Sequence, residues 1–229
     1  MKNIESIDVS NNAKPNEKKE KKDIRPIWIY IVITYILPII IIILGHKITG
    51  TLSSATAQLY NVLTFLVLGL IMFIIFAIMY FKRIKADIKR LTKNNIIFVV
   101  IIAIFGLSVN YVVGLFNLPS NNQNIAENLI NSYAIPMGIY TALIAPCIEE
   151  LVFRVGIGNI IKNNVVFVII SALSFGLVHS RGASILIYVF LGAIFTITYI
   201  KTDRNLVAAA FVHMVNNAVG VLLVLLSLQ

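Results

Sequence analysis

The sequence predicts an all-α fold, a polytopic membrane helix bundle with about seven transmembrane helices. Hydrophobic residues occupy 59% of the 229 positions and charged residues only 13%, and the mean hydropathy is +0.89. A soluble domain typically has about 25% charged residues, so this chain is too apolar for a water-soluble fold. Because lipid offers backbone groups no hydrogen-bond partners, each apolar segment must form a helix.

A helix of about 20 apolar residues can cross a bilayer, and the sequence contains seven apolar segments near this length. They lie at 26–45, 57–81, 96–118, 133–161, 165–178, 183–200 and 205–228. The first segment is too long for a signal-peptide core and no small-residue cleavage site follows it, so we expect an uncleaved span. The fifth segment is short, so its outer end stops within the bilayer and needs shielding by neighbouring helices.

Lysine and arginine residues fall almost entirely on one side of the predicted membrane. With seven spans and a cytoplasmic N-terminus, sixteen of the 19 face inward, Lys47 and Arg181 face outward, and Arg154 lies within a span. An excess of lysine and arginine is typical of the cytoplasmic segments of membrane proteins. We therefore expect a multi-pass cell-membrane protein with its N-terminus in the cytoplasm. It also accounts for the net charge of +9 as attraction to membrane lipids, which argues against nucleic acid as a partner.

The predicted spans differ in their polar content, which divides the chain into three regions. Residues 1–25 are polar and lysine-rich, as in a disordered basic cytoplasmic tail. The three spans within 26–132 contain no charged residue, and we interpret this region as an N-terminal transmembrane scaffold. The four spans within 133–228 contain nearly all of the ionisable residues at bilayer depth, so we expect function to reside there.

Three charged residues lie in the fourth span, where each costs about 2.5–3.5 kcal/mol on insertion scales. Glu150 and Arg154 are four positions apart, so they share a helix face and can pair. We interpret this pair as structural. Glu149 points about 100° away from it, toward a different neighbour.

Two histidines lie on the neighbouring spans at comparable depths. At 1.5 Å per residue, Glu149, His179 and His213 lie about 18, 21 and 12 Å from the inner ends of their spans, so we expect one shared cavity. Asn217 follows His213 by four positions, as His179 follows Phe175. A carboxylate held by a histidine can act as general base on water, and a histidine with an asparagine can stabilise an oxyanion. The set therefore suits attack of water on a peptide carbonyl.

These residues form three motifs along the chain: E-E-x-x-x-R in EELVFR (149–154), F-x-x-x-H in FGLVH (175–179) and H-x-x-x-N in HMVNN (213–217). In this order, on successive spans, they resemble the CPBP family of intramembrane proteases. This family is also called Abi or CAAX-protease-like and includes the type II CAAX prenyl endopeptidases. The resemblance covers about residues 133–228 and implies that these four helices form a catalytic core.

The resemblance also implies roles for individual residues in an intramembrane endopeptidase. Glu149 would activate water with the assistance of His179, and His213 and Asn217 would stabilise the oxyanion. Supporting residues would complete the first two motifs: Glu150, Arg154 and Phe175. The substrate would be a peptide or protein at the membrane, in CAAX-like processing, bacteriocin self-immunity or surface-protein processing.

Two alternatives accompany this hypothesis. Glu149, His179 and His213 could instead ligate zinc, although the chain lacks H-E-x-x-H and Asn217 suits an oxyanion donor better. We therefore expect no cofactor and no metal. The second alternative is a different class of protein, a non-enzymatic membrane immunity factor or a small transporter. Such a protein would use the same polar cavity to bind a peptide or relay protons.

Overall fold

The computed structural model describes residues 23–49, 54–114, 128, 130, 132–180 and 182–226. The elements follow in the order α1 (Arg25–Ile31), η1 (Val32–Ile36), α2 (Leu37–Thr49), α3 (Ser54–Arg90), α4 (Lys93–Gly114), α6 (Ala134–Ile139), η2 (Tyr140–Ile144), α7 (Ala145–Glu150), η3 (Leu151–Gly156), α8 (Ile157–Ile160), α9 (Asn164–His179), η4 (Gly182–Ser184), α10 (Ile185–Lys201) and α11 (Leu206–Leu226). The segments η1 to η3 are π-helical and η4 is a 3₁₀ turn. Nearly all of the predicted tail 1–25 lies outside the described residues, as do the outer ends of two predicted spans, 115–118 and 227–228.

The helices confirm the predicted fold class, a polytopic helical membrane protein. Four stretches of the described chain are long and apolar enough to cross a membrane: Arg25–Gly45, Val62–Arg90, Ala134–Ile160 and Leu206–Leu226. Three shorter apolar helices accompany them: Lys93–Val109, Asn164–His179 and Ile185–Lys201. Together they coincide with the seven predicted segments. The orientation in the membrane and the division into three regions stay predictions.

Helix α3 is longer than the predicted span, which ended at residue 81. It continues through the basic segment to Arg90 and has 37 residues, which corresponds to about 55 Å against a hydrocarbon core of about 30 Å. The added residues, KRIKADIKR, contain no glycine or proline and are mostly good helix formers. Lys89 and Arg90 in the last turn also complement the negative end of the helix dipole. The basic segment is therefore a helical extension beyond the span.

The fourth span is interrupted by two π-helical segments that flank the adjacent glutamates. Pro146 lies in the first turn of α7. Proline has no backbone N–H group, which is tolerated in the first turn of a helix but interrupts the hydrogen bonds of a helix interior. The wider π-helical turns of η2 come directly before α7, and those of η3 come directly after Glu150, the last residue of α7. Such π-bulges often mark functional segments of a helix. Here they place both carboxylates on a six-residue α-helical insert.

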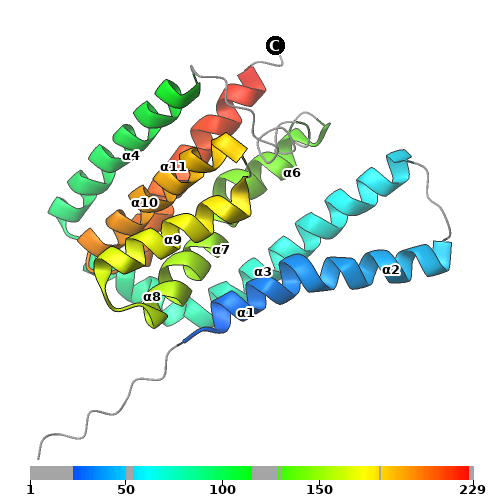
Figure 1. Ribbon diagram of the computed structural model, residues 1–229, viewed down its shortest axis with the longest axis horizontal. Helices are drawn as coiled ribbons and strands as arrows, with labels where there is room; N and C mark the ends of the chain where they lie inside the picture. Colours follow the sequence, from blue (N-terminus) through cyan, green and yellow to red (C-terminus); the bar gives the residue numbers. More distant parts are fainter. Residues whose placement is uncertain are drawn as a thin grey trace, which may run out of the picture.

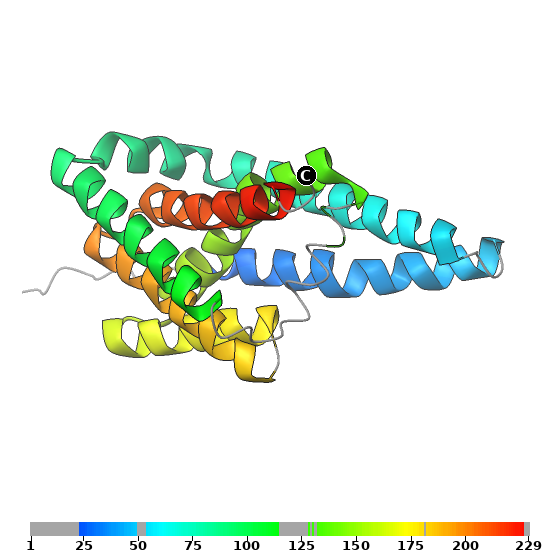
Figure 2. The ribbon, with the colours of Figure 1, turned by 90° about the horizontal axis from the view of Figure 1, so that it is seen from above.

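The helices form a bundle with one projecting arm. Figure 1 shows α2 and the first half of α3 extending together away from the rest of the bundle, while α9, α10 and α11 lie within it. Figure 2 shows α9 beside α10 from a second direction. Their backbones approach closely, because a Cβ atom on Gly192 would come within 3.0 Å of Cβ of Phe175. Glycine at such a crossing is a common device of membrane helix packing.

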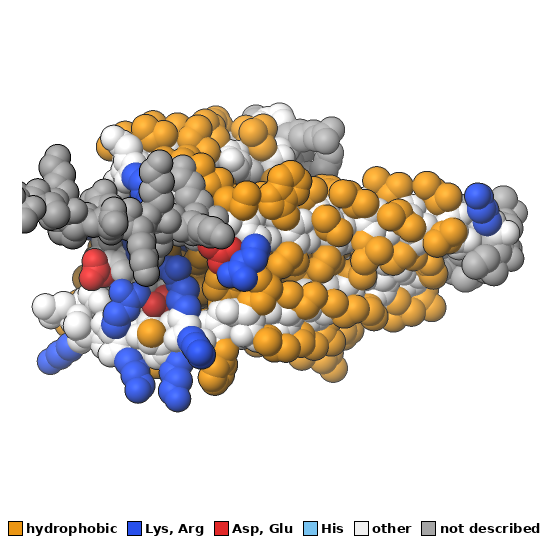
Figure 3. Space-filling view, turned by 90° about the horizontal axis from the view of Figure 1, so that it is seen from below, with side chains coloured by type: hydrophobic (Ala, Val, Ile, Leu, Met, Phe, Trp, Pro, Cys, Tyr) orange, Lys and Arg blue, Asp and Glu red, His pale blue; other side chains and the backbone are white. Residues whose placement is uncertain are grey.

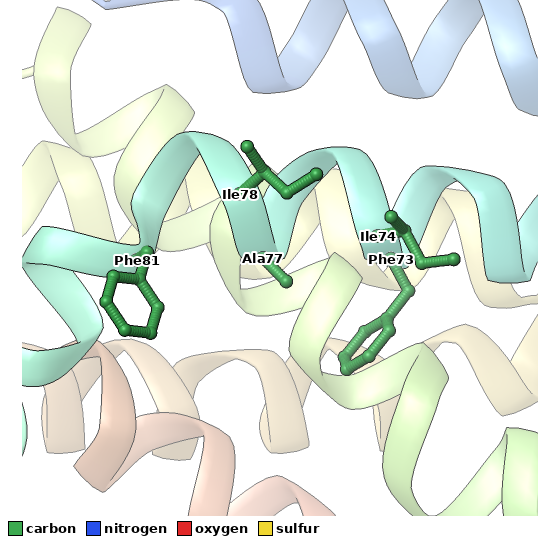
Figure 4. Close-up of a pocket in the computed structure, with 5 residues that line it drawn as sticks. All are labelled: Phe73, Ile74, Ala77, Ile78 and Phe81. Carbon is green, nitrogen blue, oxygen red and sulfur yellow. The ribbon is translucent and has the colours of Figure 1, made fainter.

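The surface separates apolar and basic side chains. In Figure 3, hydrophobic side chains cover the projecting arm, whereas most Lys and Arg side chains gather at the opposite end of the molecule. A hollow of about 410 Å³ lies on the side of α3 and is lined only by apolar residues, shown in Figure 4: Phe73, Ile74, Ala77, Ile78 and Phe81. None of the predicted site residues lines it. We interpret it as part of the lipid-facing surface.

At the basic end, a buried aspartate of α3 holds the start of α11. Asp87 is 1% exposed, and its Oδ2 accepts a hydrogen bond from the backbone nitrogen of Leu206 at 2.8 Å. Its carboxylate pairs with Arg90 at 2.5 Å, and its backbone carbonyl accepts from Asn205 Nδ2 at 2.7 Å. The helix that carries His213 is thus capped by a residue from another helix.

A second polar contact fixes the start of α1. The Oδ2 atom of Asp23 accepts a hydrogen bond from the Tyr80 hydroxyl at 2.7 Å, and its Oδ1 pairs with Arg25 Nε at 2.8 Å. The backbone carbonyl of Asp23 accepts from Asn159 Nδ2 at 3.1 Å. The bonds from Arg25, followed by that from Tyr80, lower the pKa of Asp23 to about 2. This cluster links α1 to α3 and α8.

Candidate active site

The predicted ion pair of the fourth span is present, and it has a third member. The Oε2 atom of Glu150 lies 2.9 Å from Nε of Arg154, and both side chains are 0% exposed. The other oxygen, Oε1, lies 3.0 Å from Nδ1 of His213 on α11. Glu150 therefore has partners on two helices, and it contacts a residue that the sequence assigned to the chemistry.

Arg154 lies in a pocket of aromatic rings and hydroxyl groups. Its Nη1 donates to Ser171 Oγ at 2.9 Å, and Thr196 Oγ1 lies 3.1 Å from the same oxygen. Three rings surround its guanidinium, with the Cζ atom 5.3 to 5.9 Å from their centroids: Phe153, Phe175 and Phe195. Cation–π contacts and hydrogen bonds together compensate for burying this charge. Sequence reasoning missed Ser171, Thr196 and Phe195.

Glu149 lies between two imidazoles from two other helices. Its Oε2 is 3.2 Å from Nε2 of His179 on α9 and 3.7 Å from Nε2 of His213 on α11. The side chains of Glu149 and His179 remain 14% and 13% exposed, whereas that of His213 is 3% exposed. The structure thus brings together the carboxylate and both histidines that the sequence placed at similar depth. Glu149 and His179 remain accessible from one side.

The hydrogen bonds of His179 define where its proton lies. Its Nδ1 is 2.8 Å from the backbone carbonyl oxygen of Phe175, which can only accept, so Nδ1 carries a hydrogen. The neutral ring then has a bare Nε2. A contact of 3.2 Å between Nε2 and Oε2 of Glu149 consequently needs one further proton, shared by this pair. Glu149 and His179 therefore form a unit that can take up or release a proton.

The same reasoning applies to His213. Because Glu150 is paired with Arg154, it is a carboxylate, and Nδ1 of His213 donates to it. The neutral ring again has a bare Nε2, directed toward Glu149. His213 can donate from Nε2 only when both of its ring nitrogens carry a hydrogen.

Asn217 lies one helical turn beyond His213 on α11. Its Nδ2 donates to the backbone carbonyl of Thr141 at 3.0 Å. The predicted spacing holds, but this hydrogen bond joins Asn217 to η2 of the fourth span rather than to the glutamates. An amide group has two hydrogens, so one remains for another acceptor.

Phe175 lies between the two histidines. Its ring stacks on that of His179, with centroids 4.1 Å apart and an interplanar angle of 23°. The same ring meets His213 edge-on, with centroids 5.5 Å apart. Phe175 is 2% exposed. It acts as the common contact of both imidazoles and of Arg154.

Zinc ligation by the same side chains was the sequence-based alternative. Within the described part of the chain, no group of three or more His, Cys, Asp or Glu side chains is arranged to hold a metal ion. Nδ1 of His213 faces Glu150 and Nδ1 of His179 faces a backbone carbonyl, which leaves both Nε2 atoms directed toward Glu149. The absence of a bound metal therefore stays a prediction.

Comparisons with known proteins match the part of the chain that contains the three motifs. Residues 131–219 match the family described as type II CAAX prenyl endopeptidase Rce1-like, and the predicted resemblance is thereby confirmed. An uncharacterized protein of Mycoplasma capricolum is 28% identical over 201 residues, which are 77% of this chain and 59% of that protein. The membrane-embedded CAAX protease MroQ of Staphylococcus aureus is 34% identical over 116 residues, 46% of this chain and 47% of MroQ.

A Bacillus subtilis protein named YdiL is 32% identical over 117 residues, 49% of this chain and 46% of YdiL. The chain therefore spans about half the length of the curated relatives it matches. No solved structure matches it.

Proposed function

Because residues 131–219 match the type II CAAX prenyl endopeptidase Rce1-like family, we propose that the protein is an intramembrane endopeptidase of the glutamate type. It hydrolyses a peptide bond within or next to the membrane. The observation that supports this most is the position of Oε2 of Glu149, which faces Nε2 of His179 and Nε2 of His213. Placing a carboxylate and two imidazoles within the membrane costs free energy, and ionisable residues kept there usually have a functional role.

The proposed reaction begins with water held by Glu149. The carboxylate takes a proton from the water as its oxygen attacks the carbonyl carbon of the substrate, and His179 holds Glu149 in position. General-base assistance of this kind typically contributes about 10²- to 10⁴-fold. When the tetrahedral intermediate collapses, Glu149 passes the proton to the departing amine nitrogen, so the proton balance closes.

The oxyanion is the second requirement. His213 as imidazolium donates from Nε2, and Asn217 donates the amide hydrogen that Thr141 does not use. Each such donor is worth roughly 10²- to 10³-fold in turnover. Glu150 orients His213, and Arg154 balances the charge of Glu150.

The position of the site in the membrane and the names of the relatives support a peptide or protein at the membrane as the substrate. MroQ is named a CAAX protease, and we propose for this chain either CAAX-like processing, bacteriocin self-immunity or the processing of surface proteins. The partners are membrane lipids and a peptide or protein substrate. The alternative is a binding protein or transporter that uses the same residues without hydrolysis.

The test separates hydrolysis from binding. Membranes with the wild-type protein are compared with membranes with Glu149→Gln, and new protein termini are identified by mass spectrometry. The matched control is Asp203→Asn, which also neutralises a carboxylate but in an exposed turn at φ 62°, a conformation that asparagine tolerates. We expect termini that vanish only in Glu149→Gln. Wild-type termini that persist in Glu149→Gln would contradict the assigned base.

Metal dependence is tested on the purified protein. We propose that turnover survives prolonged chelation and that no stoichiometric zinc is present. Loss of turnover on chelation, with recovery on addition of zinc, would instead assign Glu149, His179 and His213 as ligands.

A further inference from the structure

Helix α10 contributes no residue to the three motifs, yet it contacts both histidines of the site. The ring of Tyr188 stacks on His179 with centroids 5.3 Å apart and an interplanar angle of 22°. The ring of Phe195 stacks on His213 with centroids 4.3 Å apart and an angle of 19°. Each imidazole therefore stacks on an aromatic ring of α10, and for His179 this contact is additional to its stacking on Phe175.

The spacing of these two rings follows from helix geometry. Tyr188 and Phe195 are seven positions apart, so they lie on one face of α10, two turns or about 10.5 Å from each other. The same face of α10 packs against α9 through Gly192, where an added Cβ would lie 3.1 Å from Cα of Ala172. Thr196 adds a polar contact to Ser171 on α9. The two rings are therefore carried by a helix that is tightly held.

Each histidine needs such support because its hydrogen bonds leave one rotation open. His179 is bonded through Nδ1 to Phe175 and faces Glu149 through Nε2. Both atoms lie in the ring plane, so the ring can still tilt about the line that joins them. A stacked aromatic ring opposes that tilt, because aromatic rings prefer offset-stacked arrangements.

We propose that α10 is an aromatic platform that positions the two imidazoles, Tyr188 for His179 and Phe195 for His213. Both are positioning residues, since they act through the histidines. The kinetic part of this proposal rests on the proposed protease function, whereas the geometric part does not. The platform extends the site to a helix that the motifs do not mark.

The kinetic test replaces each ring by an aliphatic side chain. In Tyr188→Leu and Phe195→Leu we expect turnover to fall by roughly 10- to 100-fold with KM nearly unchanged, because a small misplacement of a reacting group costs that much. Tyr188→Phe retains the ring and should restore turnover. The matched control is Phe190→Leu, the same change on the same helix at a side chain that is 44% exposed. A Tyr188→Leu enzyme no slower than Phe190→Leu overturns the proposal.

A second measurement needs no activity. The chain has 3 histidines, so ¹³C-histidine labelling of the detergent-extracted protein gives few ring signals. A stacked ring shifts the proton resonances of its neighbour by its ring current. We expect Tyr188→Leu to move the His179 signals and Phe195→Leu to move those of His213. Shifts of this pattern in a protein that cleaves nothing would support the platform and reject the protease, whereas unmoved signals would reject the platform.

Discussion

The Nδ1 atom of His213 lies 3.0 Å from Oε1 of Glu150. The second glutamate of the adjacent pair is therefore more than the partner of Arg154. It holds the imidazole of His213 in one orientation, with Nε2 directed toward Glu149. The two carboxylates lie one on each side of the same imidazole.

Arg154→Met should mainly lower stability, because it leaves Glu150 buried without a cation. Breaking a buried ion pair in this way typically costs about 3–5 kcal/mol. The double variant Glu150→Gln with Arg154→Met removes both charges and should regain much of the melting temperature. It should still turn over slowly, because Nδ1 of His213 has lost its carboxylate. Melting temperature and peptide cleavage are measured for both variants; a fully active double variant would show that Glu150 has no role in orienting His213.

Gly192→Ala should weaken the contact between α9 and α10 and displace Phe175. The added Cβ would lie 3.0 Å from Cβ of Phe175 and 3.1 Å from Cα of Ala172, and such overpacking costs about 1–3 kcal/mol. Because Phe175 stacks on His179, turnover should fall as well. Gly106→Ala is the control, since nothing lies within 4 Å of its Cβ. Equal melting temperatures and rates in the two variants would argue against this contact.

The Asp23 carboxylate should make the protein less stable as the pH falls into the acid range. Its folded pKa of about 2 is below the ordinary 3.8, so its contribution is fully present above about pH 4 and is lost as the pH falls toward 2. The melting temperature of the wild type should exceed that of Asp23→Asn at pH 6, and the difference should shrink at pH 2.5. A difference that stays constant across this range would show that the Asp23 carboxylate is not stabilised by Arg25 and Tyr80.

The predicted orientation is tested by labelling single cysteines in a Cys147→Ala background. Lys47→Cys should react with a membrane-impermeant maleimide in intact cells, because it lies on the predicted outer side. Ile88→Cys, at a side chain that is 55% exposed at the basic end of α3, should react only after lysis. The reverse pattern would place the N-terminus outside.

Much of the architecture was predictable because apolar length and charge at bilayer depth are strong signals in a sequence. The ends of the fourth and fifth spans agree with the helices within about one or two residues. Glu149, His179 and His213 were placed together by simple depth arithmetic. The Glu150–Arg154 pair followed from four-residue spacing alone.

The remaining features depend on contacts between helices that no local pattern encodes. Tyr188 and Phe195 are ordinary apolar residues of a membrane helix until α9 and α11 lie beside them. The hydroxyl of Ser171 likewise has no special signal before Arg154 reaches it. The bond from Asn217 to Thr141 joins α11 to the π-helical segment η2, and π-helices are rare.

The cap that Asp87 provides for α11 has a consequence for biosynthesis. Asp87 and the Leu206 nitrogen are 119 positions apart, so at 5–20 residues per second roughly 6 to 24 s pass between their synthesis. During this interval Arg83 and Arg90 on the same helix can already accompany the aspartate, whereas its cap partner does not yet exist. The same late helix brings His213 to Glu149. A ribosome that stalls before this point therefore leaves a membrane protein in which Glu149 and His179 lack their neighbour His213.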